Sequence, residues 1–207
     1  MTKVLIVDSA ATGDASVSRK ITSALAARLG AQGIETVRRD VGNAPVPHLT
    51  ADTVGAIRGA PAESEAAVEA LALSDSLVAE IQESDVIVIG APMYNFGMAS
   101  TLKAWFDHVL RARVTFRYTE NGPEGLVTGK KAIVVETRAG VYSDGASSAM
   151  DFQEPHIRGL LGFMGITDVT FVRAEGLAFE PEAAAQAVAE AEGAVRAIFD
   201  QELALAA

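Results

Sequence analysis

Cysteine is absent from the 207-residue chain, which excludes disulfide bonds, thiolate nucleophiles and cysteine-ligated metal centres. Positive charge is also scarce, since 17 Lys and Arg stand against 27 Asp and Glu, for a net charge of −10. Proteins bind phosphate backbones with clustered Lys and Arg, so neither nucleic acid nor an anionic membrane is an expected partner. The only histidines, His48, His108 and His156, have no partner at metal or triad spacing, and we interpret them as structural or solvated.

Long hydrophobic runs are missing as well. No window approaches the ~20 apolar residues that a membrane span needs. The N-terminus, "MTKVLIVDSA", is too short an apolar run for a signal peptide and predicts a first strand instead. The chain also has no GxxxxGK phosphate loop, no GxGxxG fingerprint and no GxSxG nucleophile elbow. We therefore expect a soluble, cytoplasmic protein that is neither a P-loop nucleotide hydrolase nor a serine hydrolase.

Five short runs rich in β-branched residues are present. They are Val4–Asp8, Thr36–Asp40, Val86–Gly90, Ala132–Thr137 and Val169–Arg173. Three of them (VLIV, VIVI, AIVV) are apolar without alternation, which is typical of parallel strands covered by helices on both faces. Helical patterns separate the runs, so the sequence predicts a doubly wound α/β sheet of five parallel strands. We find no repeat or linker and expect one domain, residues 1–207.

Two segments do not belong to a minimal five-stranded unit. Residues 43–64 are rich in Pro, Gly and Ala and should be mostly irregular. Residues 114–129, "VTFRYTENGPEGLVTG", contain two short β-rich arms around an Asn-Gly-Pro turn. This pattern predicts a β-hairpin inserted between the third helix and the fourth strand.

Ligands of open parallel sheets bind beyond the carboxyl ends of the strands, and three loops leave such ends here. The first, Ser9–Ser18, is small, rich in hydroxyl groups and leads into a helix. The N–H groups and partial positive charge of a helix N-terminus suit a phosphate, with Ser9, Ser16 and Ser18 as additional donors. The competing interpretation is that Ser16 and Ser18 only cap the helix.

The second loop, Ala91–Ala99, carries "PMYNF". Met93, Tyr94 and Phe96 offer flat apolar surface, and Asn95 offers an amide that both donates and accepts. A planar heteroaromatic ring needs this combination of a wall and hydrogen bonds. The alternative is that these side chains close the top of the sheet, but that role does not call for Asn95.

The third loop, Arg138–Tyr142, has a glycine that permits close backbone approach, Gly140, and a charge, Arg138. By itself it is most simply a surface turn. It becomes a candidate site only together with the other two loops, because all three should converge on one edge of the sheet.

Four segments together resemble a known family: "APMYNF" followed by "TLKAWFDHV", then "VTFRYTENGPEGLVTGKKA", then "GFMGITDVTFVRAEG". They are similar to the FMN-dependent NADH azoreductases, flavodoxin-like enzymes that also reduce quinones. The similarity extends from "KVLIVDS" to the last helix. It implies a flavodoxin-like fold, one FMN per subunit, NADH or NADPH as electron donor, quinones and azo compounds as substrates, and a homodimer.

The resemblance also assigns residues by position. The phosphate would be held by Ser16, Val17 and Ser18, with a contact from Ser9, and the isoalloxazine ring and ribityl chain by Met93, Tyr94, Asn95 and Phe96. The third FMN loop would be Thr137, Arg138, Ala139 and Gly140. Asn95, with Tyr118 and Phe163, would shape the substrate side of the pocket across the dimer.

This chain departs from the family pattern at three places. Relatives often read Ser-Arg-Gly-Gly in the third loop, where this chain has Thr137 and Ala139. Relatives often have two adjacent hydroxyl residues after the first strand, where this chain has Ser9 and Ala10. Residues 139–155 are the least family-like segment, and substrate preference is expected to differ there.

The family mechanism implies that the nicotinamide donor reduces FMN by hydride transfer and leaves before a quinone or azo compound takes the electrons. Cleaving an azo bond takes four electrons and therefore two such cycles. The cofactor carries this chemistry, which explains why the sequence offers no catalytic acid, base or nucleophile.

Two alternatives remain open at this point. The first is a flavodoxin-type electron carrier serving a protein partner, although the predicted hairpin favours a walled pocket for small substrates. The second is an interaction protein that has lost its cofactor, against which the Ser16/Ser18 loop and Asn95 argue. The choice between NADH and NADPH, and the physiological acceptor, also stay open.

Overall fold

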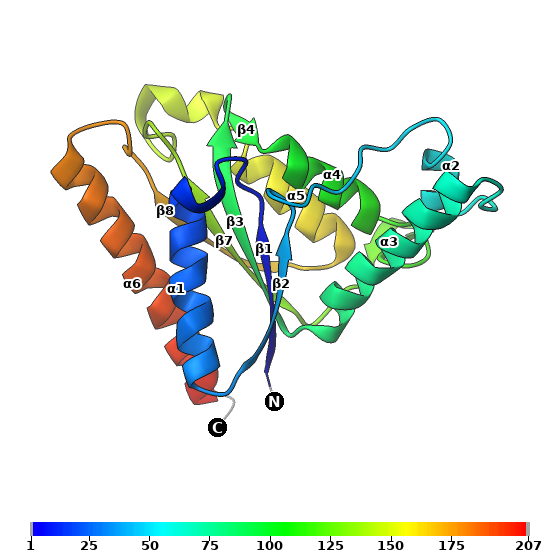
Figure 1. Ribbon diagram of the computed structural model, residues 1–207, viewed down its shortest axis with the longest axis horizontal. Coiled ribbons are helices and arrows are strands. Elements are labelled where there is room, and N and C mark those ends of the chain that lie inside the picture. The colour runs from blue at the N-terminus through cyan, green and yellow to red at the C-terminus, as the bar shows by residue number, and fades with distance from the viewer. Residues whose placement is uncertain (1, 206–207) are drawn as a thin grey trace.

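A computed structural model, which describes residues 2–205, has a central parallel sheet between two layers of helices (Figure 1). The strands, in spatial order, are β2 (Glu35–Asp40), β1 (Lys3–Asp8), β3 (Val86–Tyr94), β7 (Lys131–Thr137) and β8 (Asp168–Ala174). All four neighbouring pairs among these strands are parallel. The prediction of a five-stranded, doubly wound sheet is confirmed.

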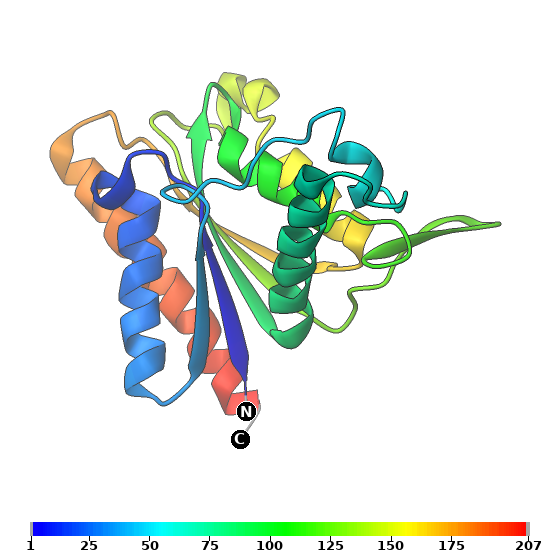
Figure 2. The same cartoon turned by 45° about the vertical axis from the view of Figure 1, so that its right-hand side comes forward.

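Helices cover both faces of the sheet, as Figures 1 and 2 show. One face carries α1 (Val17–Ala31) and α6 (Pro181–Leu205), and the other carries α3 (Glu65–Glu83), α4 (Ser100–Val109) and α5 (Glu154–Met164). The shorter elements are the 3-10 turns η1 (Gly13–Ala15) and η2 (Gly145–Met150) and the four-residue helix α2 (Val54–Ile57). Residues 43–64 are otherwise irregular, as predicted.

The two-layer covering explains the unbroken apolar runs. On β1, Val4 and Ile6 pack in the core beneath α1 and α6, whereas Leu5 and Val7 pack in the core on the opposite face. All four side chains are fully buried. A strand buried on both faces needs apolar residues at every position, which is the pattern that the sequence shows.

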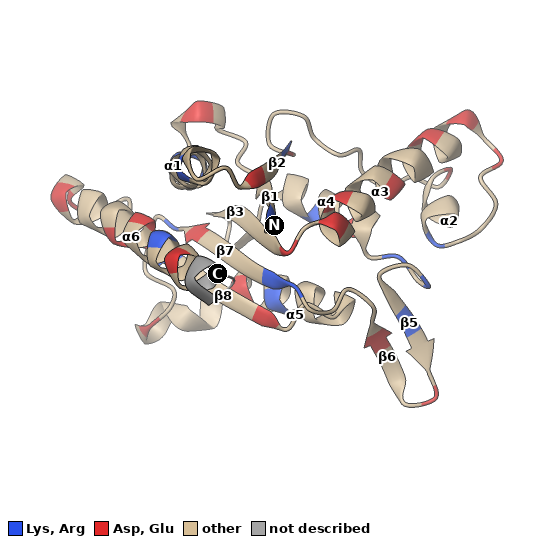
Figure 3. Cartoon of the chain, turned by 90° about the horizontal axis from the view of Figure 1, so that it is seen from below, with Lys and Arg blue, Asp and Glu red and all other residues tan. Residues whose placement is uncertain are grey.

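The predicted hairpin is present as β5 (Phe116–Thr119) and β6 (Gly122–Gly125), and it projects from the body of the molecule (Figures 2 and 3). Its base packs against the end of α5. A Cβ placed on Gly125 would lie 2.1 Å from the backbone nitrogen of Gly165, so only glycine permits this approach.

The third strand is longer than the sequence predicts. The apolar run ends at Gly90, but β3 continues to Tyr94, and the chain then turns back through β4 (Gly97–Met98). The expectation of a free loop at this place was therefore wrong. Met93 pairs with Met98 and Tyr94 with Gly97, so the "MYNF" segment is a tight antiparallel turn.

In the cartoon of Figure 3, positions of Lys and Arg and of Asp and Glu are spread over the helices, strands and loops of the chain. Within residues 2–205, no helix is long and apolar enough to cross a bilayer. The same part of the chain has no group of three or more His, Asp or Glu side chains placed to hold a metal ion.

Candidate functional site

The three predicted loops meet at the carboxyl edge of the sheet. The backbone N–H of Ala11 donates to the Tyr94 hydroxyl at 3.2 Å, which joins the first loop to the second. The rings of Phe96 and Tyr142 meet edge to face with centroids 6.0 Å apart, which joins the second loop to the third. The convergence expected from strand order is thus observed.

Ser9 lies at the start of the first loop, where its hydroxyl donates to the carbonyl of Gly90 at 2.7 Å. Its side chain is fully buried and links β1 to β3. The next residue, Ala10, packs against Gly42, at which a Cβ would lie 2.1 Å from the Ala10 carbonyl oxygen. Backbone atoms of Ala10 make this contact, so it requires glycine at position 42.

Ser16 and Ser18 lie together at the N-terminus of α1, with their hydroxyl oxygens 3.0 Å apart. Ser16 is the N-cap, because its oxygen accepts from the Arg19 N–H at 3.3 Å. The capping interpretation is therefore correct for Ser16, whereas Ser18 and the half-buried Val17 occupy the first turn. The first backbone N–H groups of a helix have no helical acceptor, so this end can donate to an anion.

The nearest arginine to this helix end is already neutralised. Arg19 forms a two-pronged ion pair with Asp40, with 2.7 Å between Nη2 and Oδ1, and its Nε donates to the carbonyl of Gly13. The Arg19 guanidinium holds the pKa of Asp40 at about 2. Positive potential for an anion must therefore come mainly from the helix terminus and not from Arg19.

The turn in the second loop has an unusual backbone. Asn95 and Phe96 both have positive φ, 48° and 71°. A two-residue hairpin turn of this kind prefers Asn followed by Gly, so Asn95 fits its position and Phe96 does not. A bulky residue in the left-handed region costs on the order of 1–2 kcal/mol. Strain of this kind is concentrated at functional sites, and here it presents an aromatic ring at the loop tip.

The side chains at the tip of this turn are accessible. Phe96 is 40% exposed, and Asn95 is exposed without a side-chain hydrogen bond to any described residue. Met93 and Tyr94 are half-buried beside them. An apolar ring and an uncommitted amide at one loop tip can pack against a planar ligand and hydrogen-bond to its edge.

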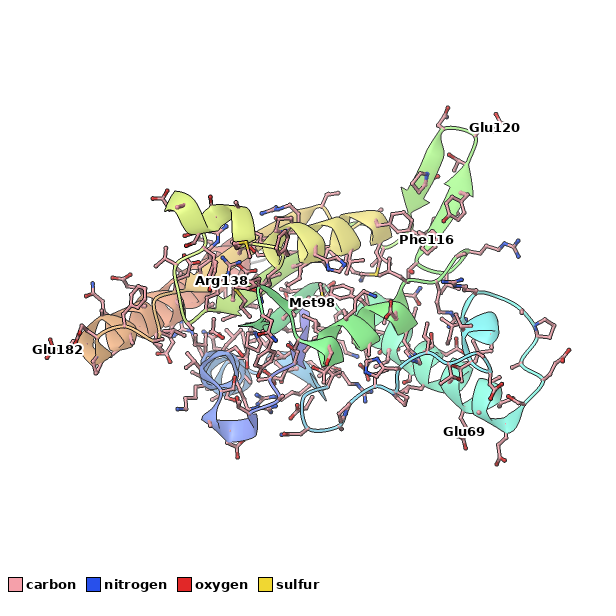
Figure 4. All side chains as sticks on the ribbon, turned by 90° about the horizontal axis from the view of Figure 1, so that it is seen from above. Glu69, Met98, Phe116, Glu120, Arg138 and Glu182 are labelled. Atoms are coloured by element: carbon pink, nitrogen blue, oxygen red, sulfur yellow. The ribbon has the colours of Figure 1, made fainter. Side chains whose placement is uncertain are left out.

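The side chain of Arg138 does not face a ligand. It is fully buried, and its guanidinium contacts Glu136 at 2.7 Å, Asp151 at 3.0 Å and Glu175 at 3.0 Å. The expectation that Arg138 offers a charge was therefore wrong, because three carboxyl groups surround its guanidinium. Figure 4 shows Arg138 near the middle of the molecule.

The residues on either side of Arg138 in the third loop have small side chains. Thr137 is buried at the end of β7, Ala139 is exposed, and Gly140 is half-buried. A Cβ on Gly140 would lie 3.2 Å from the Tyr142 ring, so glycine admits that ring. Tyr142 was not predicted as a site residue, and nothing in its local sequence distinguishes it.

Further buried polar residues stand behind this loop. Gln153 donates through Nε2 to the Ala91 carbonyl at 2.9 Å and accepts from Arg138 Nε at 3.1 Å. Burial raises the pKa of Glu136 to about 8, although the Arg138 charge opposes that shift. No periodic pattern marks Gln153 or Glu136 in the sequence, so neither was predicted.

Tyr118 and Phe163 are not close to the three loops within one chain. Tyr118 lies on the projecting hairpin and is 73% exposed. Phe116 contacts both rings edge to face, with centroids 5.6 Å from Tyr118 and 4.6 Å from Phe163. In Figure 4, Phe116 lies at the hairpin base, well separated from Met98 and Arg138.

His108 has a structural role, as expected. It is buried in α4, and its Nε2 lies 3.0 Å from the carbonyl of Pro47. Burial lowers its pKa. It therefore fastens the irregular 43–64 segment to the core.

This arrangement is similar to proteins already known. Residues 2–199 match the family profile described as a flavodoxin-like fold, which defines the class of the protein. The chain is 48% identical over 197 residues to an FMN-dependent NADH:quinone oxidoreductase of Hyphomonas neptunium, covering 94% of each chain. It is 52% identical over 180 residues to the one of Azotobacter vinelandii, covering 86% of this chain and 89% of the relative. The chain therefore belongs to the family of these FMN-dependent NADH:quinone oxidoreductases.

A solved structure supports the same assignment. The azoreductase from Bacillus anthracis strain Sterne superimposes with a TM-score of 0.81 at 29% sequence identity. The match covers 94% of this chain and 98% of that one. The resemblance seen in the sequence motifs is confirmed by both comparisons.

Proposed function

We propose that this protein is an FMN-dependent NADH:quinone oxidoreductase that binds FMN across the three loops at the carboxyl edge of the sheet. The observation that carries the proposal is the convergence of a free helix N-terminus, an exposed aromatic-amide turn and a glycine loop on one edge. The relatives at 48% and 52% identity bear that activity in their names.

The residues present fit this cofactor. The phosphate would lie at the N-terminus of α1, against Ser18 and the N–H groups of Val17 and Ser18, with Ser16 fixing the helix end. The ring would pack against Met93–Phe96 and receive a hydrogen bond from Asn95. When bound, FMN supplies the hydride chemistry, and the chain binds and orients it.

In the third loop, only the backbone and small side chains of Thr137, Ala139 and Gly140 are placed to contact the cofactor. The Arg138 guanidinium is engaged elsewhere, so its contribution is indirect. We extend the substrates to azo compounds, since the structurally similar Bacillus anthracis protein is an azoreductase.

The active form is proposed to be a homodimer. Phe116, whose ring contacts those of Tyr118 and Phe163, lies well away from Met98 in Figure 4, so we infer that a second copy of the chain brings these two residues to the proposed ring-binding turn. The hairpin borders a hollow of about 680 Å³ lined by Leu110, Phe116 and Phe163 among others. An isolated two-stranded hairpin with an exposed aromatic residue is poorly stable in water, which favours a covered one.

The oligomer is tested by light scattering on purified protein, for the wild type and for Tyr118→Ala. We expect a dimeric mass of about twice 21.6 kDa for the wild type.

We place the enzyme in the cytoplasm, because its nicotinamide donor is an intracellular metabolite.

The catalytic proposal is tested by an anaerobic visible spectrum of the purified protein after addition of NADH and then benzoquinone. We expect a flavin spectrum that bleaches with NADH and returns with quinone. A bound flavin that neither NADH nor NADPH bleaches would instead indicate an electron carrier. No flavin binding after FMN addition would refute the proposed site.

A further inference from the structure

The sequence segment that is least family-like, residues 139–155, ends in a cluster of buried polar side chains. Gln153 is fully buried, and both ends of its amide are used. Its Nε2 donates to the carbonyl of Ala91 on β3, and its Oε1 accepts from Nε of Arg138 after β7. One side chain thus joins the strand that leads to the "MYNF" turn with the third loop.

Neighbouring residues make the same connection. The backbone N–H of Phe152 donates to the carbonyl of Phe96 at 3.1 Å, which fixes the tip of the turn. One carboxylate oxygen of Asp151 accepts from the N–H groups of Gln153 and Glu154 at the start of α5, both at 3.0 Å. The other carboxylate oxygen lies 3.0 Å from Arg138. Residues 151–153 are therefore fixed to the second loop and to Arg138.

Arg138 connects this cluster to the remaining element at the edge. Its guanidinium pairs with Glu175, which follows β8, and its backbone N–H donates to the carbonyl of Ala174 at 2.9 Å. Glu175 in turn accepts from the N–H of Tyr142 at 2.9 Å. A buried arginine with three carboxylates and an amide holds its neighbours in one geometry, because each lost contact would leave a buried polar group unpaired.

We propose that Gln153 and Arg138 are positioning residues for the flavin ring, which hold the Met93–Phe96 turn and the Ala139–Gly140 loop at a fixed separation. The inference rests on the proposed FMN site and adds two residues that do not contact the cofactor. Gln153 bonds to Ala91 and Arg138, and Arg138 pairs with carboxyl groups behind the third loop. Neither residue bonds to Ser16 or Ser18. Their loss should therefore weaken ring binding and leave phosphate binding intact.

The test measures dissociation constants of FMN and of riboflavin for the full-length protein, by titration of flavin fluorescence. Gln153→Glu keeps the acceptor for Arg138 Nε but removes the donor to the Ala91 carbonyl. In this variant we expect the dissociation constants of FMN and of riboflavin to rise by the same factor, about tenfold, which corresponds to ~1.4 kcal/mol of binding free energy. Gln153→Leu, which removes both bonds, should have at least the same effect.

Two further variants sharpen the interpretation. Gln82→Glu makes the same chemical change on an exposed residue near the end of α3, at the opposite edge of the sheet, and should bind both flavins as the wild type does. Arg138→Lys keeps the charge but loses the Nε donor, and it should reproduce the equal loss. The thermal midpoint of unfolding of each flavin-free variant is also recorded. If the residues had a purely structural role, the substitutions would lower this midpoint but would not change the flavin affinities measured at temperatures well below it.

The flavin affinities of the variants decide between support and refutation of the proposal. Equal loss of FMN and riboflavin in the folded Gln153→Glu protein supports the proposal. Wild-type affinity for both flavins in Gln153→Glu and Arg138→Lys overturns it, as does a loss confined to FMN. If Gln153→Leu does not fold, Gln153→Glu decides. A wild-type protein that binds neither flavin would refute the FMN site itself, which is a different result.

Discussion

The sharpest test of the proposal that the Met93–Phe96 turn binds the flavin ring is a pair of substitutions at Asn95. Its φ of 48° lies in the left-handed region, where a Cβ is unfavourable. Asn95→Ala therefore removes the amide and also strains the turn, by on the order of 1 kcal/mol relative to asparagine. Asn95→Gly removes the same amide but relieves the backbone, because glycine adopts this conformation readily. Comparing the two variants separates the effect of losing the amide from the effect of straining the turn.

The expected magnitudes follow from these terms. If the amide hydrogen-bonds to the flavin ring, both variants should lose about 1 kcal/mol of binding free energy, roughly fivefold in the dissociation constant of FMN. Only Asn95→Ala should show the additional loss of unfolding free energy from the strained turn. Fluorescence titration with FMN and urea unfolding of the flavin-free protein measure the two quantities separately. Wild-type FMN affinity in Asn95→Gly would show that the amide does not bind the ring.

The remaining predictions concern charge and the phosphate. Replacing Ser16 and Ser18 together with Ala should weaken FMN binding more than riboflavin binding, since only FMN has the phosphate; equal losses in the two titrations would contradict this role. The Asp40 carboxyl has a folded pKa of about 2 against an ordinary 3.8, so its stabilisation is complete above pH 3.8 and is lost as pH falls toward 2. This stabilisation is at most ~2 kcal/mol, because water screens the partly exposed carboxylate, and urea unfolding of Asp40→Asn should show a correspondingly weaker loss over that range. Glu136, whose pKa is raised to about 8, acts in the opposite direction: the folded state loses stability as pH rises from 4.5 to 8. For Glu136→Gln, the urea midpoints of unfolding at pH 6 and at pH 9 should differ less than they do for the wild type. A difference as large as that of the wild type would show that Glu136 does not cause the pH dependence.

The parts of the fold that depend on local pattern were predictable. The strand runs VLIV, VIVI and AIVV have no polar face, and strands without a polar face are buried on both sides in this structure. The Asn-Gly-Pro pattern correctly indicated a hairpin, but its turn was placed wrongly, because Glu120 and Asn121 form the loop and Gly122 and Pro123 already pair within β6. Ser16 lies directly before the apolar pattern of α1 and does cap it. Each of these signals is contained within a few consecutive residues.

The continuation of β3 was not predictable in the same way. Gly90 and Pro92 both indicate a break, yet Pro92 continues the strand in register with Thr137. Tertiary pairing with β7 and the return through β4 extend the strand beyond the point where local preference ends it. The left-handed conformation of Phe96 could not be predicted from the sequence either, because phenylalanine disfavours it.

The orientation of the Arg138 side chain depends on residues from two distant segments of the chain. Asp151, Glu175 and the amide of Gln153 meet the guanidinium only after β7, α5 and β8 have come together. In the sequence, an arginine beside a glycine at a strand end indicates an anion site. The same pattern results when carboxylates from elsewhere in the chain bury that arginine, and a single sequence does not distinguish the two.

The arginines of this edge therefore build the site without attracting the ligand through their charge. Arg19 is paired with Asp40, and Arg138 is enclosed by carboxylates, so neither guanidinium is uncommitted. A phosphate at α1 would then depend on backbone N–H groups and hydroxyls, for which a helix terminus contributes at most ~2 kcal/mol. In the proposed site, affinity would therefore come largely from the ring, and ring affinity would depend on how accurately the second and third loops are held. The proposal thus predicts that the buried bonds of Gln153 matter more to binding than a further cation would.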